Sequence, residues 1–201
     1  MSEESSYLKI ALVVSIVAII ALVFINYVDL DKDNDEHPDI NDGLSILKEF
    51  NLTDIETGTT TKGTFFIIQS GHSLHVKISA DIFVGSTDIG GISFNIPPEL
   101  QLTNVLCSLG NDTSDKHVSI WNSAAENIDY TTRVEIARSY PPQYIPIGGG
   151  EGMLLLDLQL KRSTTLSEID SLNFSIAVGG KIKDGIAIMG TVYEKITILL
   201  S

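Results

Sequence analysis

An acidic segment near residue 30 carries the most specific chemistry in the chain, because its carboxylates recur at regular intervals. Counted from Asp31, aspartates stand at positions 1, 3, 5, 9 and 12 of a twelve-residue loop, and His37 stands at position 7. A calcium ion takes about six to eight oxygen ligands, and a loop of this length winds around the ion and presents them at this spacing. Position 7 supplies a backbone carbonyl oxygen in such loops, so the imidazole of His37 is not itself a ligand. The sequence therefore predicts a calcium site formed by Asp31, Asp33, Asp35, His37, Asp39 and Asp42.

One position of the loop departs from the usual calcium pattern. The sharp turn at position 6 usually needs glycine, and Glu36 stands there. A positive φ strains a residue that carries a side chain, so we expect weaker calcium binding than in a loop with glycine. Over about twenty residues the segment resembles the calcium loops of dockerin modules, which usually pair two loops, and of thrombospondin type 3-like repeats. The alternative is a solvated linker without a metal, since residues 29–42 carry a net charge of −6.

Two elements are expected to position this loop. On its C-terminal side, the spacing of Leu44, Leu47 and Phe50 predicts a short exiting helix. On its N-terminal side, residues 10–28 contain no charged side chain. These nineteen residues, at a helical rise of about 1.5 Å each, nearly cover the ~30 Å hydrocarbon core of a bilayer. We therefore predict an uncleaved transmembrane helix over 10–28.

The residues around this helix predict its orientation. Lys9 is the only basic residue before the apolar run, so the positive-inside tendency places residues 1–9 in the cytoplasm as a short tail. Three sequons lie downstream, and they can be glycosylated only if that part of the chain is translocated. The sequence thus predicts a single-pass protein of the cell membrane whose C-terminal domain is extracytoplasmic. The predicted glycosylation sites are Asn51, Asn111 and Asn173.

Two alternatives for the apolar run stay open. A cleaved signal peptide needs a basic start, a shorter run and small residues before the cut, whereas this run ends in Phe-Ile-Asn-Tyr-Val at 24–28. A pilin-type subunit, whose N-terminal helices pack into a filament core, needs a processing site with Gly or Ala after a basic residue, and Ile10 follows Lys9. In that alternative the chain forms a homo-oligomeric filament at the cell surface.

From about Gly63 the sequence predicts a mostly β domain. Apolar and polar residues alternate over 74–82 and over 154–161, which places the apolar side chains on one face of a strand. Glycines stand between such segments, where turns require them. About nine strands at this spacing predict an antiparallel two-sheet sandwich over 63–201, after a segment 29–62 that holds the acidic loop, the short helix and a linker. The predicted strands are 64–69, 73–83, 91–96, 100–108, 117–122, 131–137, 152–161, 171–178 and 191–199.

The order of motifs in this domain resembles the cohesin-like β-sandwich family. The motif GHSLHV at 71–76 opens one strand, and GISFNIPPEL at 91–100 follows a glycine-bearing turn. A glycine-led apolar strand begins at Gly152, and an Asp-Gly pair at 184–185 precedes the last strand. The family usually has an aspartate where Pro97 stands, and no dockerin-contact residue can be transferred to this chain. The resemblance implies the sandwich fold and bears less directly on function.

Composition and motifs exclude several kinds of function. A net charge of −13 leaves no basic surface for nucleic acid. The sequence contains no nucleophile elbow, no phosphate-binding loop and no spaced set of Cys and His, so we expect a binding protein and not an enzyme. A carboxylate pair that hydrolyses a polysaccharide stays an alternative, because its spacing is three-dimensional. The single cysteine, Cys107, has no partner for a disulfide within the chain and is expected to be buried.

Aromatic residues between 110 and 150 offer a lead to a contact surface. Tyr140 and Tyr144 are flanked by prolines in a loop-rich stretch, where binding residues often lie, and we expect them to be exposed. Trp121, within an apolar strand, is expected to fill the core. Together these features predict a calcium-stabilised, membrane-anchored recognition or scaffolding module that binds a protein or a glycan at the cell surface.

Overall fold

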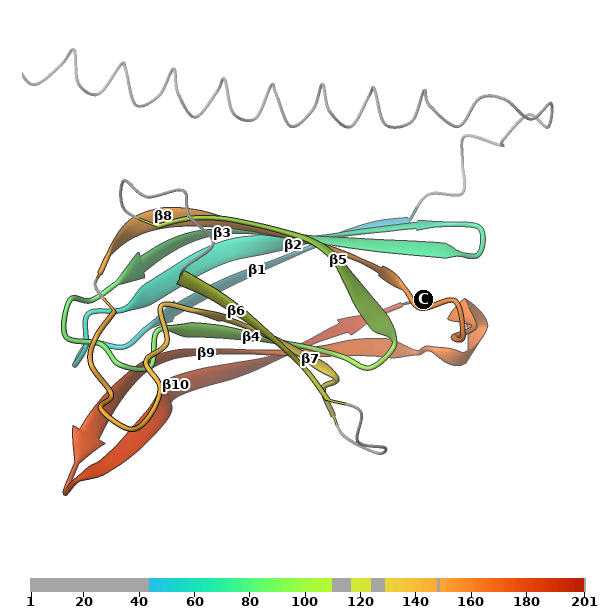
Figure 1. Cartoon of the computed structure of the whole chain (residues 1–201). Helices are drawn as coiled ribbons and strands as arrows, with labels where there is room; N and C mark the ends of the chain where they lie inside the picture. The colour runs from blue at the N-terminus through green and yellow to red at the C-terminus, as the bar shows by residue number, and fades with distance from the viewer. Residues whose placement is uncertain (1–43, 110–116, 124–128, 148, 201) are drawn as a thin grey trace, which may run out of the picture. The chain divides into compact units, whose positions relative to one another are not determined.

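Two antiparallel sheets of five strands each face one another in the structure of this chain, which is a computed structural model (Figure 1). The structure describes residues 44–109, 117–123, 129–147 and 149–200. The strands are β1 (Leu44–Thr53), β2 (Thr60–Ser70), β3 (Ser73–Val84), β4 (Ile92–Ile96), β5 (Leu100–Leu109), β6 (Val118–Asn122), β7 (Thr132–Ile136), β8 (Gly150–Leu160), β9 (Ser171–Lys183) and β10 (Ile186–Leu199), with a short 3-10 helix, η2 (Leu166–Glu168). Their order is β1-β2-β3-β8-β5 in the first sheet and β10-β9-β4-β7-β6 in the second. The predicted mostly β, two-sheet antiparallel fold is therefore confirmed.

Several sequence predictions fall outside the described residues. They concern the apolar run 10–28, the calcium ligands between Asp31 and Asp42, and the sequon at Asn111. Among the residues that the structure describes, no helix is long and apolar enough to cross a bilayer.

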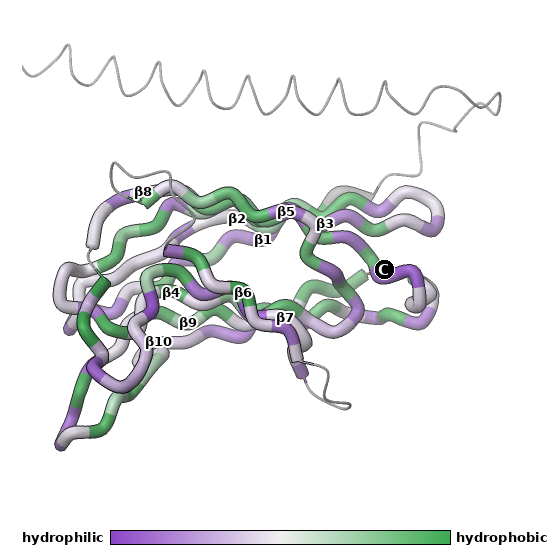
Figure 2. Tube along the Cα trace, in the orientation of Figure 1, coloured by the Kyte–Doolittle hydropathy of each residue, from purple (hydrophilic) through white to green (hydrophobic). Residues whose placement is uncertain are grey.

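Alternating side chains fill the space between the two sheets. Along β3 every even-numbered residue is buried and every odd-numbered residue is at least partly exposed. Figure 2 shows the same alternation of hydrophobic and hydrophilic residues along the strands. Phe65 from β2 and Phe174 from β9 meet across the sandwich with ring centroids 4.7 Å apart. The period of two thus gives each sheet one apolar face, and the two faces form the core.

Each of the nine predicted strands overlaps an observed strand. β9 and β10 run longer than predicted because they continue as a hairpin around Asp184 and Gly185. These two residues have φ values of 52° and 76°. Two successive positive φ angles form the tight turn whose twist matches that of a hairpin. The Asp-Gly turn predicted before the last strand is therefore confirmed.

The short helix predicted over 44–50 is wrong, because these residues belong to β1 and pair antiparallel with β2. Phe50 and Leu52 are buried in the core from this strand. Lys48 is on the same face of β1 as Phe50 and Leu52, which is the face toward the other sheet. Its side chain is nevertheless exposed to solvent, because β1 is the edge strand of its sheet. A charged residue at an inward position of an edge strand breaks the apolar alternation, so the sequence pattern matches a helix instead. The sandwich therefore begins at Leu44 and includes β1 and the start of β2, both within the segment 29–62 for which the sequence predicts a helix and a linker.

The loop between β1 and β2 fastens the first sheet to the second. The nearly buried carboxylate of Asp54 accepts hydrogen bonds from the hydroxyls of Thr57 (3.0 Å) and Thr191 and from the backbone N–H of Glu56 (3.0 Å). Burial raises the pKa of Asp54, but these hydrogen bonds outweigh burial and leave the pKa below its ordinary value. Gly179 in β9 makes room for this carboxylate, since a Cβ at that position would lie 2.0 Å from Asp54 Oδ2. The sandwich is thereby closed along the side where β1 contacts β10.

Candidate functional site

The outer face of the second sheet carries a group of aromatic and charged side chains. Alternate apolar residues of β7 are buried in the core, so the period of two turns Arg133 and Glu135 to the outer face. The strand register places Trp121 of β6 directly opposite Arg133, and Arg133 directly opposite Asn95 of β4. Trp121, Arg133 and Asn95 therefore form one row across three neighbouring strands.

The segment after β7 adds a second aromatic ring to this face. Tyr140 packs against Trp121 with ring centroids 5.8 Å apart and 50° between the ring planes. The indole N–H of Trp121 donates to the hydroxyl of Tyr140 at 3.2 Å. That hydroxyl in turn donates to the carboxylate of Glu135 at 2.5 Å. Hydrogen bonds as well as packing therefore hold the two rings in place.

Glu135 is the buried centre of this group. Its side chain is 3% exposed, forms an ion pair with Arg138 and lies 3.7 Å from Nη1 of Arg133. A carboxylate buried without such partners costs several kcal/mol, so both guanidinium groups and the Tyr140 hydroxyl stabilise it. Burial raises the pKa of Tyr140, and the hydrogen bond to Glu135 raises it further. Tyr140 consequently keeps its proton and donates to Glu135 at neutral pH.

These side chains border a hollow of about 470 Å³, which we name the aromatic hollow. Its volume is within the ~300–1,000 Å³ range of small-ligand sites. Trp121, 54% exposed, and Tyr140, 38% exposed, form part of its apolar wall, and the half-buried Tyr130 also lines it. The Arg133 Nε–H donates to Oδ1 of Asn95 at 2.7 Å, which orients the guanidinium group. The principal lining residues are Asn95, Trp121, Arg133, Glu135, Arg138 and Tyr140.

The structure separates the two tyrosines that the sequence predicts as a contact surface. Tyr140 lines the aromatic hollow, whereas Tyr144 is half-buried, with φ 45°, and does not line it. The expectation that Trp121 fills the core is wrong. Val118 and Ile120 occupy the inner face of β6, so alternation turns Trp121 outward.

Two predicted glycosylation sites lie on strands with their side chains exposed. Asn51 is on β1, and Asn173 is on β9, where its Oδ1 accepts a hydrogen bond of 2.8 Å from Thr197. Glycosylation at both positions stays a prediction.

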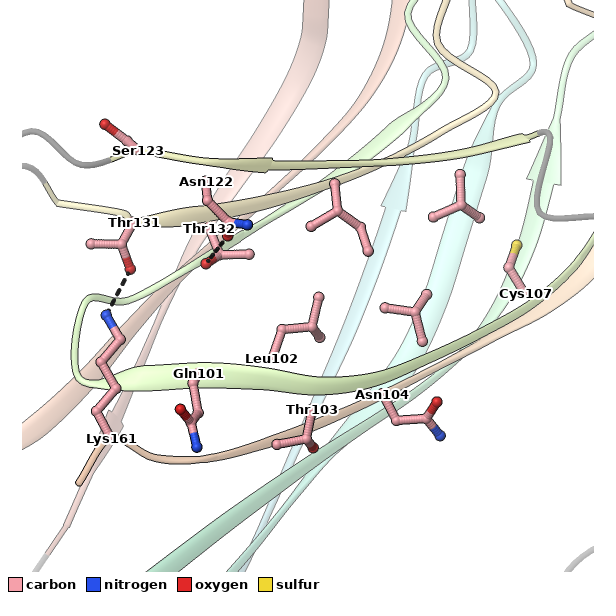
Figure 3. Close-up of a pocket in the computed structure, with 13 residues that line it drawn as sticks. Gln101, Leu102, Thr103, Asn104, Cys107, Asn122, Ser123, Thr131, Thr132 and Lys161 are labelled. Atoms are coloured by element: carbon pink, nitrogen blue, oxygen red, sulfur yellow. Dashed lines mark hydrogen bonds between the residues drawn. The ribbon is translucent and has the colours of Figure 1, made fainter.

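A second hollow, of about 700 Å³, opens between β5 and β6, which are edge strands of the two sheets (Figure 3). Leu102 and Cys107 point from β5 toward β6, and Lys161 Nζ donates to Thr131 Oγ1 at 3.3 Å at one end. Burial raises the pKa of the half-buried Cys107 thiol to about 11, so the thiol stays protonated at neutral pH. A protonated thiol is a poor nucleophile. The described lining of this hollow has no aromatic ring and one charged group, so it defines a ligand less closely than the aromatic hollow does.

Asp88, in the loop between β3 and β4, is a fully buried acid whose pKa is raised above its ordinary value. Its carboxylate accepts hydrogen bonds from the hydroxyl of Thr59 and from the N–H of Gly90 (2.7 Å). Burial raises the pKa of Asp88, and the hydrogen bonds offset that effect only in part. A carboxyl group closed off from ligands holds the loop in place. Within the described parts of the chain, no group of three or more His, Cys, Asp or Glu residues is placed to hold a metal ion.

The raised pKa of Asp88 predicts how stability depends on pH. The folded state binds the Asp88 proton more tightly than the unfolded state, whose pKa is close to 3.8. The contribution of this proton to stability is complete below pH 3.8 and is lost as pH rises through the folded-state pKa. We therefore expect the stability of the wild type relative to Asp88→Asn to fall with rising pH over that window and then to level off. Urea unfolding of both variants at a series of pH values measures this difference, and a difference that grows in favour of the wild type contradicts it.

Comparison with models of known protein families and with curated protein sequences gives no match for this chain.

Proposed function

We propose that this protein is a recognition module that binds a glycan at a cell surface through the aromatic hollow. One observation carries the proposal: two exposed aromatic rings, Trp121 and Tyr140, are fixed by hydrogen bonds beside side chains that offer polar groups to a ligand. The faces of such rings stack on the apolar C–H face of a sugar ring, while guanidinium and amide groups bond its hydroxyls. Because the rings are held before a ligand arrives, little conformational entropy is lost on binding.

The size of the hollow favours a glycan over a protein partner. A stable protein interface buries about 800 Å² on each partner and has several apolar anchors at its centre. The aromatic hollow is concave and about 470 Å³ in volume, and its lining is polar or charged apart from the rings of Trp121, Tyr130 and Tyr140. These are the features of a small-ligand site, and a chain of sugars can enter it one or two units at a time.

The cell-surface part of the proposal rests on the sequence. The apolar run 10–28 would anchor the module, and the acidic loop between Asp31 and Asp42 would stabilise the segment before the sandwich by binding calcium. The exposed sequons at Asn51 and Asn173 and the cohesin-like motif order agree with an extracytoplasmic recognition domain. A filament subunit is the alternative, and ordered fibres of the full-length chain on cells would favour it.

Replacing Trp121 by alanine should weaken glycan binding about thirtyfold, because a fully engaged aromatic anchor contributes about 2 kcal/mol. Full-length protein in detergent is titrated against a panel of neutral and acidic polysaccharides by affinity electrophoresis. Ile120→Ala is the matched control, since Ile120 is the neighbouring residue on β6, is also exposed, and faces the other side of the strand.

Two results would contradict this proposal. One is equal binding by the wild type and the Trp121→Ala variant across the panel. The other is Trp121-dependent capture of a purified surface protein with no polysaccharide bound, which would make the partner a protein.

A further inference from the structure

We infer that the glycan bound at the aromatic hollow is acidic, and that Arg133 binds its first carboxylate. This inference rests on the proposed function and adds the chemical class of the ligand. It is carried by the arrangement of charges on the outer face of the second sheet.

Strand register continues the row that starts at Trp121 across the whole sheet. After Trp121 come Arg133 of β7 and Asn95 of β4. Asn95 stands opposite Ser175 of β9, and Ser175 stands opposite Lys195 of β10. The row contains two cations and no acidic residue. Three strand spacings of about 4.8 Å each separate β7 from β10, so the backbone positions of Arg133 and Lys195 lie about 14 Å apart, the scale of a short oligosaccharide.

The positive charge of Arg133 is available to a ligand because Glu135 is already neutralised. Glu135 is almost fully buried and takes an ion pair from Arg138 and a hydrogen bond from Tyr140. Two guanidinium groups therefore face one carboxylate, which leaves this group a net charge of +1 in a chain whose net charge is −13. An anionic ligand finds here a local attraction that most of the surface does not offer.

The geometry of Arg133 suits a carboxylate. Its side chain is 48% exposed, and its Nε–H is occupied by Asn95, so the guanidinium plane is fixed while most of its five N–H donors stay available. Such a plane binds a carboxylate through two parallel hydrogen bonds. Trp121 stands directly opposite Arg133, at about 5 Å between Cβ atoms, so an acidic sugar that stacks on the indole brings its carboxylate within reach. Lys195 is placed to meet a second carboxylate farther along the chain.

Two forms of one polymer test this inference. Full-length protein in detergent is titrated by affinity electrophoresis with polygalacturonate and with the same polymer methyl-esterified at its carboxyl groups. We expect the acidic form to bind about tenfold more tightly. Arg133→Gln should lose about tenfold in affinity for the acidic form and clearly less for the ester, whose hydroxyls the guanidinium group also bonds. Arg133→Lys should lose less because a point charge remains. Lys195→Gln should lose about threefold for the acidic form.

Lys62→Gln is the matched control, because Lys62 is an exposed cation in the first sheet and its loss changes the net charge equally. Trp121-dependent binding that is equal for the two forms overturns the carboxylate inference and leaves the proposed function standing. An equal fold-loss of affinity for the two forms in Arg133→Gln also overturns it, since Arg133 then acts on the hydroxyls or on the fold of the site and not on a carboxylate. Absence of Trp121-dependent binding to every polysaccharide overturns the inference and the proposed function together.

Discussion

Replacing Phe50 by alanine is expected to lower the free energy of unfolding by about 3–5 kcal/mol, the range for a large aromatic residue lost from a core. Phe50 is 5% exposed and packs edge-on against Phe65 (5.3 Å between ring centroids) and Phe94 (5.9 Å). Its ring also covers Gly63 on the neighbouring strand, where a Cβ would lie 2.8 Å from the end of the ring. Removal of the ring leaves a cavity between the sheets and exposes the backbone of β2.

Leu47→Ala is the control for this experiment, because Leu47 lies on the same strand with 67% of its surface exposed and faces away from the core. We expect this variant to stay within about 0.5 kcal/mol of the wild type. Urea unfolding of the full-length protein in detergent, followed by near-ultraviolet circular dichroism, measures both variants. A similar small effect at the two positions would show that β1 does not belong to the core, and would favour a helix or linker over 44–50.

Replacing Gly152 by alanine is expected to cost about 3 kcal/mol or more, at the upper end of the range for overpacking. Gly152 lies in β8 between β3 and β5, and a Cβ there would lie 1.6 Å from the carbonyl oxygen of Ser108 and 2.9 Å from Cα of Leu109. Both obstacles belong to the backbone of β5, so no rotation of a side chain relieves the contact. The variant must move β5 away from β8 and lose ladder hydrogen bonds.

Gly71→Ala separates this effect from the general cost of replacing glycine. A Cβ at Gly71 would meet nothing within 4 Å, but its φ of 55° lies in the left-handed region. That conformation costs an alanine about 1–2 kcal/mol. Thermal unfolding should therefore show a clearly larger loss for Gly152→Ala than for Gly71→Ala, and equal losses would contradict the predicted contact with β5.

Most strands could be predicted from the sequence because their signals are local. In β3 the alternation of apolar and polar residues from Leu74 to Val84 is nearly unbroken, and the strand is bounded by turn residues. β1 was missed because its inward positions include Lys48, which only an edge strand tolerates. Whether a strand lies at an edge depends on pairing with distant segments, and a local pattern holds no information about that pairing.

The candidate site was predictable only in part for the same reason. The prolines beside Tyr140 indicated an exposed loop, and Tyr140 does line the aromatic hollow. The alternation in β7 indicates that Arg133 and Glu135 share one face of the strand. The local sequence does not indicate which of the two faces packs against the core. Trp121 joins them through the register of β6 with β7, a relation between distant residues. Asn95 joins through the register of β4 in the same way.

The hydrogen bonds that join Asp54 to the second sheet have a consequence for how the molecule carries mechanical force. Any pull from the chain that precedes Leu44 reaches the sandwich through β1. When the pull runs along the strand, it is resisted in shear by all ten residue pairs between β1 and β2 at once. At the far end of β1 the bond from Thr191 to Asp54 passes the remaining load to β10, in the sheet that bears the aromatic hollow. If the chain before Leu44 tethers the protein and a ligand is bound at the aromatic hollow, tension between them would be spread over both sheets.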